Sequence, residues 1–187
     1  MKFFCGAKEL KQNMKLGKLC LNDYCIIKVV DLGRVIGGGG ICMKFTDLSK
    51  QIYEECPFSN NAPSYRQVSK GINICGECKT EKCEAYNEEV IVPLFNIRKF
   101  NLIEERVNLK CPICKGLIEP KTVAFFLCEY KVKGRNVEGN SIKPYEFFGK
   151  ANNKNAAQYY NPIQNGDILV LELIIEIINY FWKIYAN

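Results

Sequence analysis

The sequence has no histidine among its 187 residues. Histidine is the commonest general base for serine and cysteine nucleophiles, and zinc deaminases need it in their metal-binding motif. Adjacent acidic pairs occur at Glu88-Glu89 and Glu104-Glu105, but neighbouring side chains on a strand point to opposite faces and do not work as a pair. The sequence therefore favours a protein that is not an enzyme.

The first residues, Met1-Lys2-Phe3-Phe4-Cys5-Gly6, lack the continuous apolar stretch of a secretory signal peptide. Disulfide frameworks belong to oxidising compartments, and eleven cysteines are an odd number that cannot all pair within one chain. We therefore expect reduced cysteines and a cytoplasmic or nuclear location.

The sequence also lacks a strong charge of one sign. The formal net charge is +6, from 26 basic and 20 acidic residues, and the basic residues are scattered among the acidic ones. A weak and dispersed positive charge disfavours nucleic acid as a partner without excluding it. Apolar residues make up 48% of the chain and charged residues 25%, which is the composition of a folded globular protein.

The chain does contain a cysteine motif at Cys111-Pro112-Ile113-Cys114, followed by Lys115-Gly116. This turn is typical of a zinc knuckle, in which backbone amides point at the thiolates and the glycine relieves crowding. A second cysteine group lies upstream at Cys75, Cys78 and Cys83. Two such turns can supply four thiolates to one zinc ion, and full coordination leaves no open position for a substrate. The expected site is therefore structural.

The residues alone leave the full set of ligands open. Spacing favours the C-x2-C pair of Cys75 and Cys78, although Cys78 and Cys83 form a wider C-x4-C turn that zinc sites also accept. Cys128 begins a segment of alternating apolar and polar residues, which predicts a strand with Cys128 on its apolar face. A lone cysteine there is usually a small buried hydrophobe, but Cys75 or Cys128 could still replace or join the ligands.

The N-terminal residues show a resemblance to a known family. The matching segments, in chain order, are Phe4-Cys5-Gly6, Lys8-Glu9-Leu10, Leu21-Asn22-Asp23-Tyr24-Cys25-Ile26, the apolar run to Val30 and the glycines at 37–40. Residues 3–40 thereby resemble the C-terminal half of ubiquitin. The resemblance implies a truncated β-grasp-like segment, because the family's first hairpin and main helix have no counterpart here.

A second resemblance covers about residues 37–178. It rests mainly on Gly71-Ile72-Asn73, Lys82-Cys83-Glu84-Ala85-Tyr86-Asn87, Lys110-Cys111-Pro112-Ile113-Cys114, Cys128 and Gly134. These segments are similar to those of uncharacterised fungal and protist proteins that join ubiquitin-like repeats to a RING-like or zinc-ribbon-like cysteine module. The resemblance implies one structural Zn2+ ion with four ligands, namely Cys78, Cys83, Cys111 and Cys114.

Together these features predict an α+β, mostly β protein in three parts. Residues 1–36 are expected to form the ubiquitin-like remnant, and residues 37–70 a glycine-rich linker and irregular segment with a short strand near 41–47. Residues 71–187 are expected to form a small antiparallel sheet domain with a zinc-ribbon-like site of four cysteines.

Residues 168–186 fit two secondary structures. Apolar side chains alternate from Leu169 to Ile177, as in a strand, while Glu172 and Glu176 begin a helical spacing. The β-branched content and the second resemblance favour a strand through about residue 178, preceded by a hairpin turn at 165–167. A membrane span is not expected, because two glutamates and a lysine inside it would be costly.

The expected function is protein binding, through an interaction module whose link to the ubiquitin pathway rests on the resemblance alone. The alternatives are a RING-like ubiquitin ligase scaffold and a nucleic-acid-binding zinc ribbon. A full RING binds two zinc ions through eight ligands that usually include histidine, whereas residues 71–187 contain six cysteines. One zinc ion is therefore the simpler interpretation.

Overall fold

The computed structural model describes residues 2–5, 8–10, 27–30 and 43–181. The chain forms two compact units, Met1–Cys42 and Met43–Asn187. The first contains a three-stranded antiparallel sheet in the order β2-β1-β3, built from β1 (Lys2–Cys5), β2 (Lys8–Leu10) and β3 (Ile27–Val30). Three short strands do not establish the β-grasp that the ubiquitin resemblance implies. The glycines at 37–40 lie outside the described residues.

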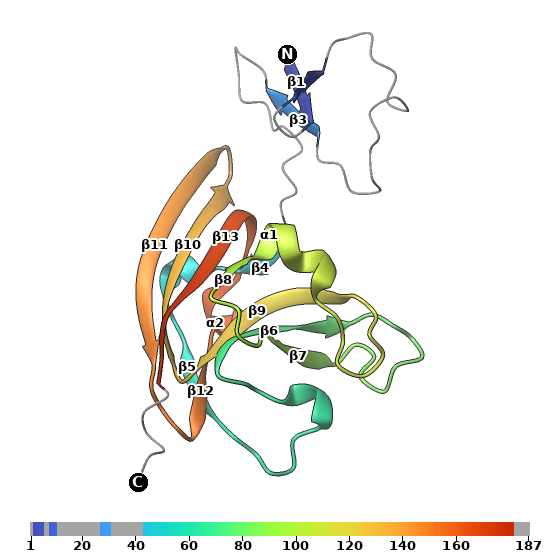
Figure 1. Cartoon of the computed structure of the whole chain (residues 1–187), viewed down its shortest axis with the longest axis vertical. Coiled ribbons are helices and arrows are strands. Elements are labelled where there is room, and N and C mark those ends of the chain that lie inside the picture. Colours follow the sequence, from blue (N-terminus) through green and yellow to red (C-terminus); the bar gives the residue numbers. More distant parts are fainter. Residues whose placement is uncertain (1, 6–7, 11–26, 31–42, 182–187) are drawn as a thin grey trace. The chain divides into compact units, whose positions relative to one another are not determined.

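The larger unit consists of two five-stranded antiparallel sheets with little helix (Figure 1). Sheet I has the order β11-β10-β13-β4, with β8 also paired to β13, and its strands are β4 (Met43–Thr46), β8 (Lys99–Asn101), β10 (Cys128–Glu138), β11 (Ser141–Ala151) and β13 (Asp167–Tyr180). Sheet II has the order β5-β12-β9-β6-β7, and its strands are β5 (Glu54–Pro57), β6 (Gly71–Cys78), β7 (Glu89–Pro93), β9 (Ile118–Phe126) and β12 (Ala156–Tyr159). The mostly β fold class is confirmed.

The helical elements of the larger unit are each a single turn. The α-helices are α1 (Leu102–Glu105) and α2 (Pro162–Asn165), and 3-10 turns cover Leu48–Lys50, Ser64–Arg66 and Arg106–Asn108. Asn101 and Asn161 cap the two α-helices, because each side-chain oxygen accepts a hydrogen bond from the amide two residues on. No helix in the described part of the chain is long and apolar enough to span a membrane.

The chain passes between the two sheets at a sharp bend. Leu127 separates β9 in sheet II from β10 in sheet I, and its φ of 47° lies in the left-handed region that non-glycine residues rarely adopt. The bend turns the side chains of both strands into one core, where the rings of Phe125 and Tyr130 stack with centroids 3.6 Å apart. Both rings are buried, as are Phe45, Tyr160 and Leu173.

The C-terminal segment is a strand, as predicted. β13 pairs with β10, β4 and β8, so it lies in the interior of sheet I. The predicted hairpin before it is wrong, because the preceding strand, β12, belongs to sheet II. Helix α2 and Gly166, with φ of 73°, redirect the chain between the sheets instead.

The range 37–70, which the sequence predicted as linker and irregular segment, contributes a strand to each sheet. β4 pairs with β13, placing Phe45 opposite Ile168, and β5 pairs with β12, placing Cys56 opposite Ala157. Each strand has four residues, and its partner strand lies about one hundred positions or more along the chain. The sequence indicated β4 near 41–47 but contained no periodic signal for β5.

Candidate metal centre

Four cysteine sulfurs converge at one end of sheet II. The Sγ atoms of Cys78, Cys83, Cys111 and Cys114 all lie within 4.8 Å of one another. The Sγ–Sγ distance is 3.7 Å between Cys78 and Cys114 and 3.8 Å between Cys83 and Cys111. A tetrahedral zinc ion with Zn–S bonds of about 2.3 Å requires Sγ–Sγ separations of about 3.8 Å. A disulfide would require about 2.05 Å. The sulfurs therefore have the spacing of zinc ligands.

The first pair of cysteines lies in the turn that follows β6. Cys78 ends that strand, and the amide of Cys83 donates to the carbonyl of Thr80 at 2.9 Å, which folds the chain back within five residues. The amide of Asn87 then donates to the carbonyl of Cys78 at 2.8 Å, closing the loop ahead of β7. Asn87 has a φ of 58°, a conformation that asparagine tolerates better than most residues.

The second pair lies in the turn that leads into β9. The amide of Cys111 donates to the carbonyl of Gly116 at 2.8 Å, and the amide of Lys115 donates to the carbonyl of Cys111 at 3.0 Å. This is the compact turn expected from the Cys-Pro-Ile-Cys motif. A Cβ atom on Gly116 would collide with Oγ1 of Thr80 in the first turn. Glycine is therefore required where the two turns meet, in line with the expectation that it relieves crowding.

Hydrogen-bond donors and burial shift the pKa values of Cys78, Cys83 and Cys114 in opposite directions. The hydroxyl of Thr80 and the amide of Gly116 lower the pKa of Cys114 to about 6. At Cys83 the amide of Ala85, 3.4 Å from Sγ, lowers the pKa, but burial and the three neighbouring thiols outweigh it and raise that pKa to about 12. Burial also raises the pKa of Cys78. Four thiolates this close repel one another, and a divalent cation at their centre removes that cost.

The cluster is continuous with the hydrophobic core. Cys78, Cys83 and Cys111 are buried, Cys114 is partly exposed, and all four belong to or pack against the main core cluster together with Leu109 and Ile118. Four protein sulfurs would complete the tetrahedral shell of one ion. The arrangement fits a structural metal and leaves no coordination position for a substrate.

The other described cysteines with side-chain information lie apart from this cluster. Cys75 packs with Ile91, Ala124 and Ala157 in a separate apolar cluster. Because strand β6 runs without interruption from Gly71 to Cys78, the C-x2-C spacing of Cys75 and Cys78 forms no turn, and their sulfurs do not converge. The four-cysteine group excludes Cys75.

Cys128 is also separate from the four-cysteine group. It is fully buried on strand β10, and burial raises the pKa of its thiol to about 12. This agrees with the expectation of a small buried hydrophobe. Cys20, Cys25 and Cys42 lie outside the described residues.

The second sequence resemblance implied these four sulfurs, but nothing in the sequence singled out the residue that joins the two turns. Thr80 contacts both, because its hydroxyl bonds to the sulfur of Cys114 and its Oγ1 occupies the space beside Gly116. The only sequence signal for Thr80 is its place inside the C-x4-C segment, and many polar residues would satisfy that pattern.

Comparison of the chain with protein-family models, with curated proteins and with solved structures found no match. The class of the protein is therefore defined by its own geometry. It is a mostly β protein whose larger unit has two antiparallel sheets and a four-cysteine cluster that can hold one metal ion, for which zinc is the best chemical fit.

Proposed function

We propose that this chain is a non-enzymatic protein-interaction module whose fold is stabilised by one structural zinc ion. The observation that supports the proposal is the convergence of four thiols, with Sγ–Sγ distances of 3.7 and 3.8 Å, from two separate turns. Tetrahedral sulfur sites select zinc or iron–sulfur clusters, and one ion needs only these four ligands.

The metal would hold together loops that have little else to order them. The segments 79–88 and 106–117 contain short turns and few regular backbone pairs. Zinc binding to small modules releases about 10 to 16 kcal/mol at pH 7, which is comparable with the whole folding free energy of a domain. In this proposal the ion fixes the end of sheet II, and the surface of the folded domain performs the function.

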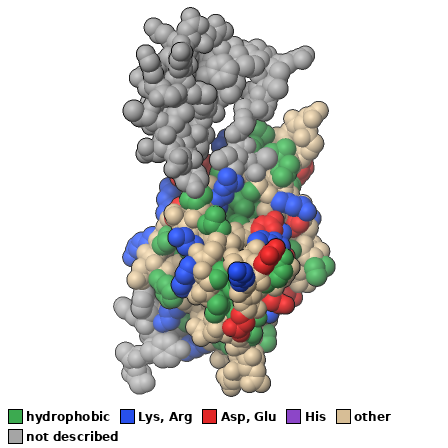
Figure 2. Space-filling model, turned by 90° about the vertical axis from the view of Figure 1, so that its right-hand side faces the viewer, with side chains coloured by type: hydrophobic (Ala, Val, Ile, Leu, Met, Phe, Trp, Pro, Cys, Tyr) green, Lys and Arg blue, Asp and Glu red, His purple; other side chains and the backbone are tan. Residues whose placement is uncertain are grey.

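Paired surface charges favour a protein partner over nucleic acid. Lys131 pairs with Glu146 at 2.8 Å and Lys150 with Glu129 at 2.9 Å, so these lysines do not form a free basic stripe. Figure 2 shows basic and acidic side chains interspersed on one face of the described unit. A phosphate-binding surface would need a clustered positive field. The proposed ubiquitin-pathway link rests on the sequence resemblance.

Among the described residues, the four-cysteine cluster is the only group of three or more His, Cys, Asp or Glu side chains whose ligand atoms lie close enough to share a metal ion. A RING-type ligase needs a second zinc site, so the one-zinc interaction module is the better fit. We expect that the purified protein does not accelerate the discharge of ubiquitin from ubiquitin-conjugating enzymes. Rapid discharge would contradict the proposal, as would nucleic-acid binding that weakens steeply with salt.

Metal analysis of matched cysteine variants tests the proposed site. We expect one zinc ion per chain in the wild type, because four thiolates complete one tetrahedral shell. Cys83→Ser should lose the ion, since a serine hydroxyl does not replace a thiolate. Cys75→Ala is the matched control and should retain it, because Cys75 lies in a different cluster. Inductively coupled plasma mass spectrometry provides the measurement. Retention of zinc by Cys83→Ser, or its loss from Cys75→Ala alone, would contradict the assignment.

A further inference from the structure

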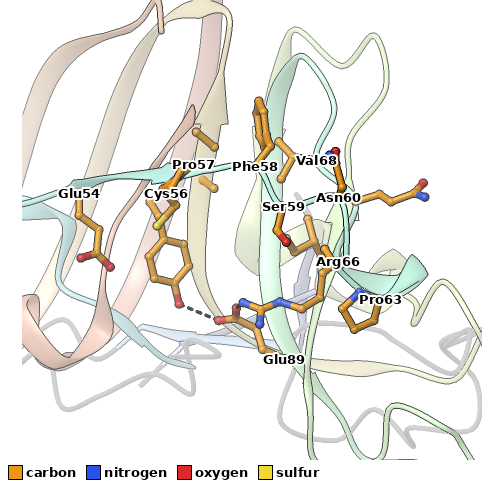
Figure 3. Close-up of a pocket in the computed structure, with 16 residues that line it drawn as sticks. Glu54, Cys56, Pro57, Phe58, Ser59, Asn60, Pro63, Arg66, Val68 and Glu89 are labelled. Carbon is orange, nitrogen blue, oxygen red and sulfur yellow. Dashed lines mark hydrogen bonds and ion pairs between the residues drawn. The ribbon is translucent and has the colours of Figure 1, made fainter. Parts of the chain in front are cut away.

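A hollow of about 800 Å³ opens on the face of sheet II opposite the core (Figure 3). Its floor includes the small side chains Ala124 and Ala157 together with Ile91, and the segment that follows β5 forms its wall. Alanines at adjacent strands leave depth that larger residues would fill. The volume lies in the range of small-molecule sites, which are about 300 to 1,000 Å³.

One wall of the hollow is apolar and fixed in position. Phe58 is 48% exposed, and its ring packs edge-to-face on Phe126 with centroids 4.8 Å apart. Val68 lines the hollow beside it, as Figure 3 shows. An exposed aromatic ring that is already held by a neighbour gives a flat apolar ligand a surface to pack on with little loss of side-chain entropy.

The polar lining carries excess negative charge. Glu54, Glu89 and Arg66 are the charged residues among those that line the hollow, which leaves one carboxylate without a matching cation. Glu89 is engaged at both oxygens, because Arg66 pairs with Oε1 at 2.9 Å and the hydroxyl of Tyr159 donates to Oε2 at 2.6 Å. At Glu54, Asn161 donates to Oε1 at 2.8 Å. Ionised carboxylates accept about four hydrogen bonds, so Glu54 has capacity left for a ligand.

The thiol of Cys56 reports the same negative field. It lines the hollow on β5, two residues from Glu54, and its pKa is raised, first by burial and then by the charges of Glu54 and Glu89. Burial disfavours a charge of either sign, but the contribution of the two glutamates reflects a negative field that favours a cation.

We infer that this hollow binds a small amine with an aromatic or compact apolar body, whose ammonium group pairs with Glu54 while the body packs on the alanine floor, where Ala157 lies opposite Cys56 between Glu54 and Phe58. An ammonium group supplies three donors and one positive charge, which match the free acceptor capacity and the uncompensated carboxylate. A ligand without the positive charge would leave that carboxylate unpaired inside the hollow.

Titration of the zinc-loaded full chain with 2-phenylethylamine, followed by NMR, tests the inference. The neutral analogue 2-phenylethanol and the anionic 3-phenylpropanoate serve as matched probes. We expect saturable shifts at Ile91, Ala124 and Ala157, with the amine binding at least tenfold more tightly than the alcohol and the carboxylate binding most weakly. Equal affinity for amine and alcohol, or shifts confined to other regions, would overturn the inference.

Variants test whether the ammonium group pairs with Glu54 and whether the ligand packs on the alanine floor. Glu54→Gln should weaken amine binding at least fivefold, while Glu138→Gln, a glutamate on β10 that pairs with Lys143 away from the hollow, should leave it unchanged. Ala157→Leu should abolish binding by filling the floor. Zinc content and the NMR spectrum of each variant show that the fold is intact. Unchanged affinity in both Glu54→Gln and Ala157→Leu would refute the assigned site, and equal losses in Glu54→Gln and Glu138→Gln would refute the specific role of Glu54.

Discussion

Gly116 is the residue at which the two cysteine turns make their closest approach. Any side chain there would enter the space held by Oγ1 of Thr80, and it would also come within 3.4 Å of the sulfur of Cys114. The position is constrained by a neighbouring element and not by its own backbone dihedrals. Metal geometry therefore depends on a residue that cannot itself bind metal.

Replacing Gly116 with alanine should push the two turns apart and weaken zinc binding. We expect a loss of about 1 to 3 kcal/mol, the usual cost of inserting a methyl group into a packed site. Adding Thr80→Ala should recover part of that loss by removing the opposing Oγ1 atom. Competition titration with a chromophoric chelator measures the affinities. If the losses of the two single variants simply add in the double variant, the steric account is wrong.

Cys128 should make the protein sensitive to alkali. Its pKa is near the ordinary value of 9.0 when unfolded and about 12 when folded, because burial disfavours the thiolate. The stability that the neutral thiol contributes is fully present below pH 9 and is lost as the pH rises from 9 to 12. We expect the stability difference between wild type and Cys128→Ala to narrow by about 1.4 kcal/mol from pH 8 to pH 10. Urea denaturation of both proteins at each pH measures this, and a constant difference would contradict it.

At the scale of elements, β10 and β11 are held together by an aromatic ring that covers a glycine. Tyr130 lies opposite Gly149 in the antiparallel register, and a Cβ on Gly149 would collide with its ring. The ring cannot move aside, because it stacks on Phe125 and its hydroxyl donates to Gln158 at 3.0 Å. The same ring thus joins sheet I to sheet II.

Gly149→Ala should therefore destabilise the protein by about 3 kcal/mol, the upper part of the range for overpacking. Gly139→Ala is a control with no steric conflict, since nothing lies within 4 Å of its added Cβ. Its left-handed φ of 56° should cost about 1 kcal/mol. Chemical denaturation of both variants measures the two losses of stability, and their zinc content should be unchanged. Equal destabilisation by the two variants would show that Tyr130 adapts.

The long strands could be predicted from sequence, and the short ones could not. Alternation over residues 128–133 and 169–177 predicted β10 and β13, because most of each strand has one face against the core. In β13 the predicted face is buried from Leu173 to Ile177, but a register shift before it leaves Leu169 exposed and buries Val170. β5 and β12 have four residues each, too few for a period to show. The passage of the chain between sheets at Leu127 depends on a left-handed backbone conformation at a leucine, for which the sequence gives no signal.

The metal ligands, too, could be predicted from the sequence only in part. The compact turn at Cys111–Cys114 follows from its own residues, but the choice of Cys83 over Cys75 depends on where β6 ends. Spacing alone favoured Cys75 and Cys78, and that interpretation is wrong because both residues lie within one extended strand. A strand that ends at Cys78 can be recognised only from the pairing of β6 with β7 and β9.

At the scale of the whole molecule, residues 43–181 form one core between two sheets, and the cysteine cluster is part of its boundary. Backbone pairing within sheet II brings the ends of β6 and the start of β9 together, which places Cys78 opposite Ile118. The fold thus positions both turns, and the metal would then lock them. In this account, zinc binding and folding of the domain are coupled.

X-ray absorption at the zinc edge of the purified full chain tests this account most directly. Four protein thiolates around one ion predict a first shell of four sulfur atoms at about 2.3 Å, with no nitrogen or oxygen neighbours at about 2.0 Å. A shell that contains nitrogen or oxygen, fewer than four sulfurs, or no zinc at all would contradict the assignment of Cys78, Cys83, Cys111 and Cys114 as the ligands of a structural metal.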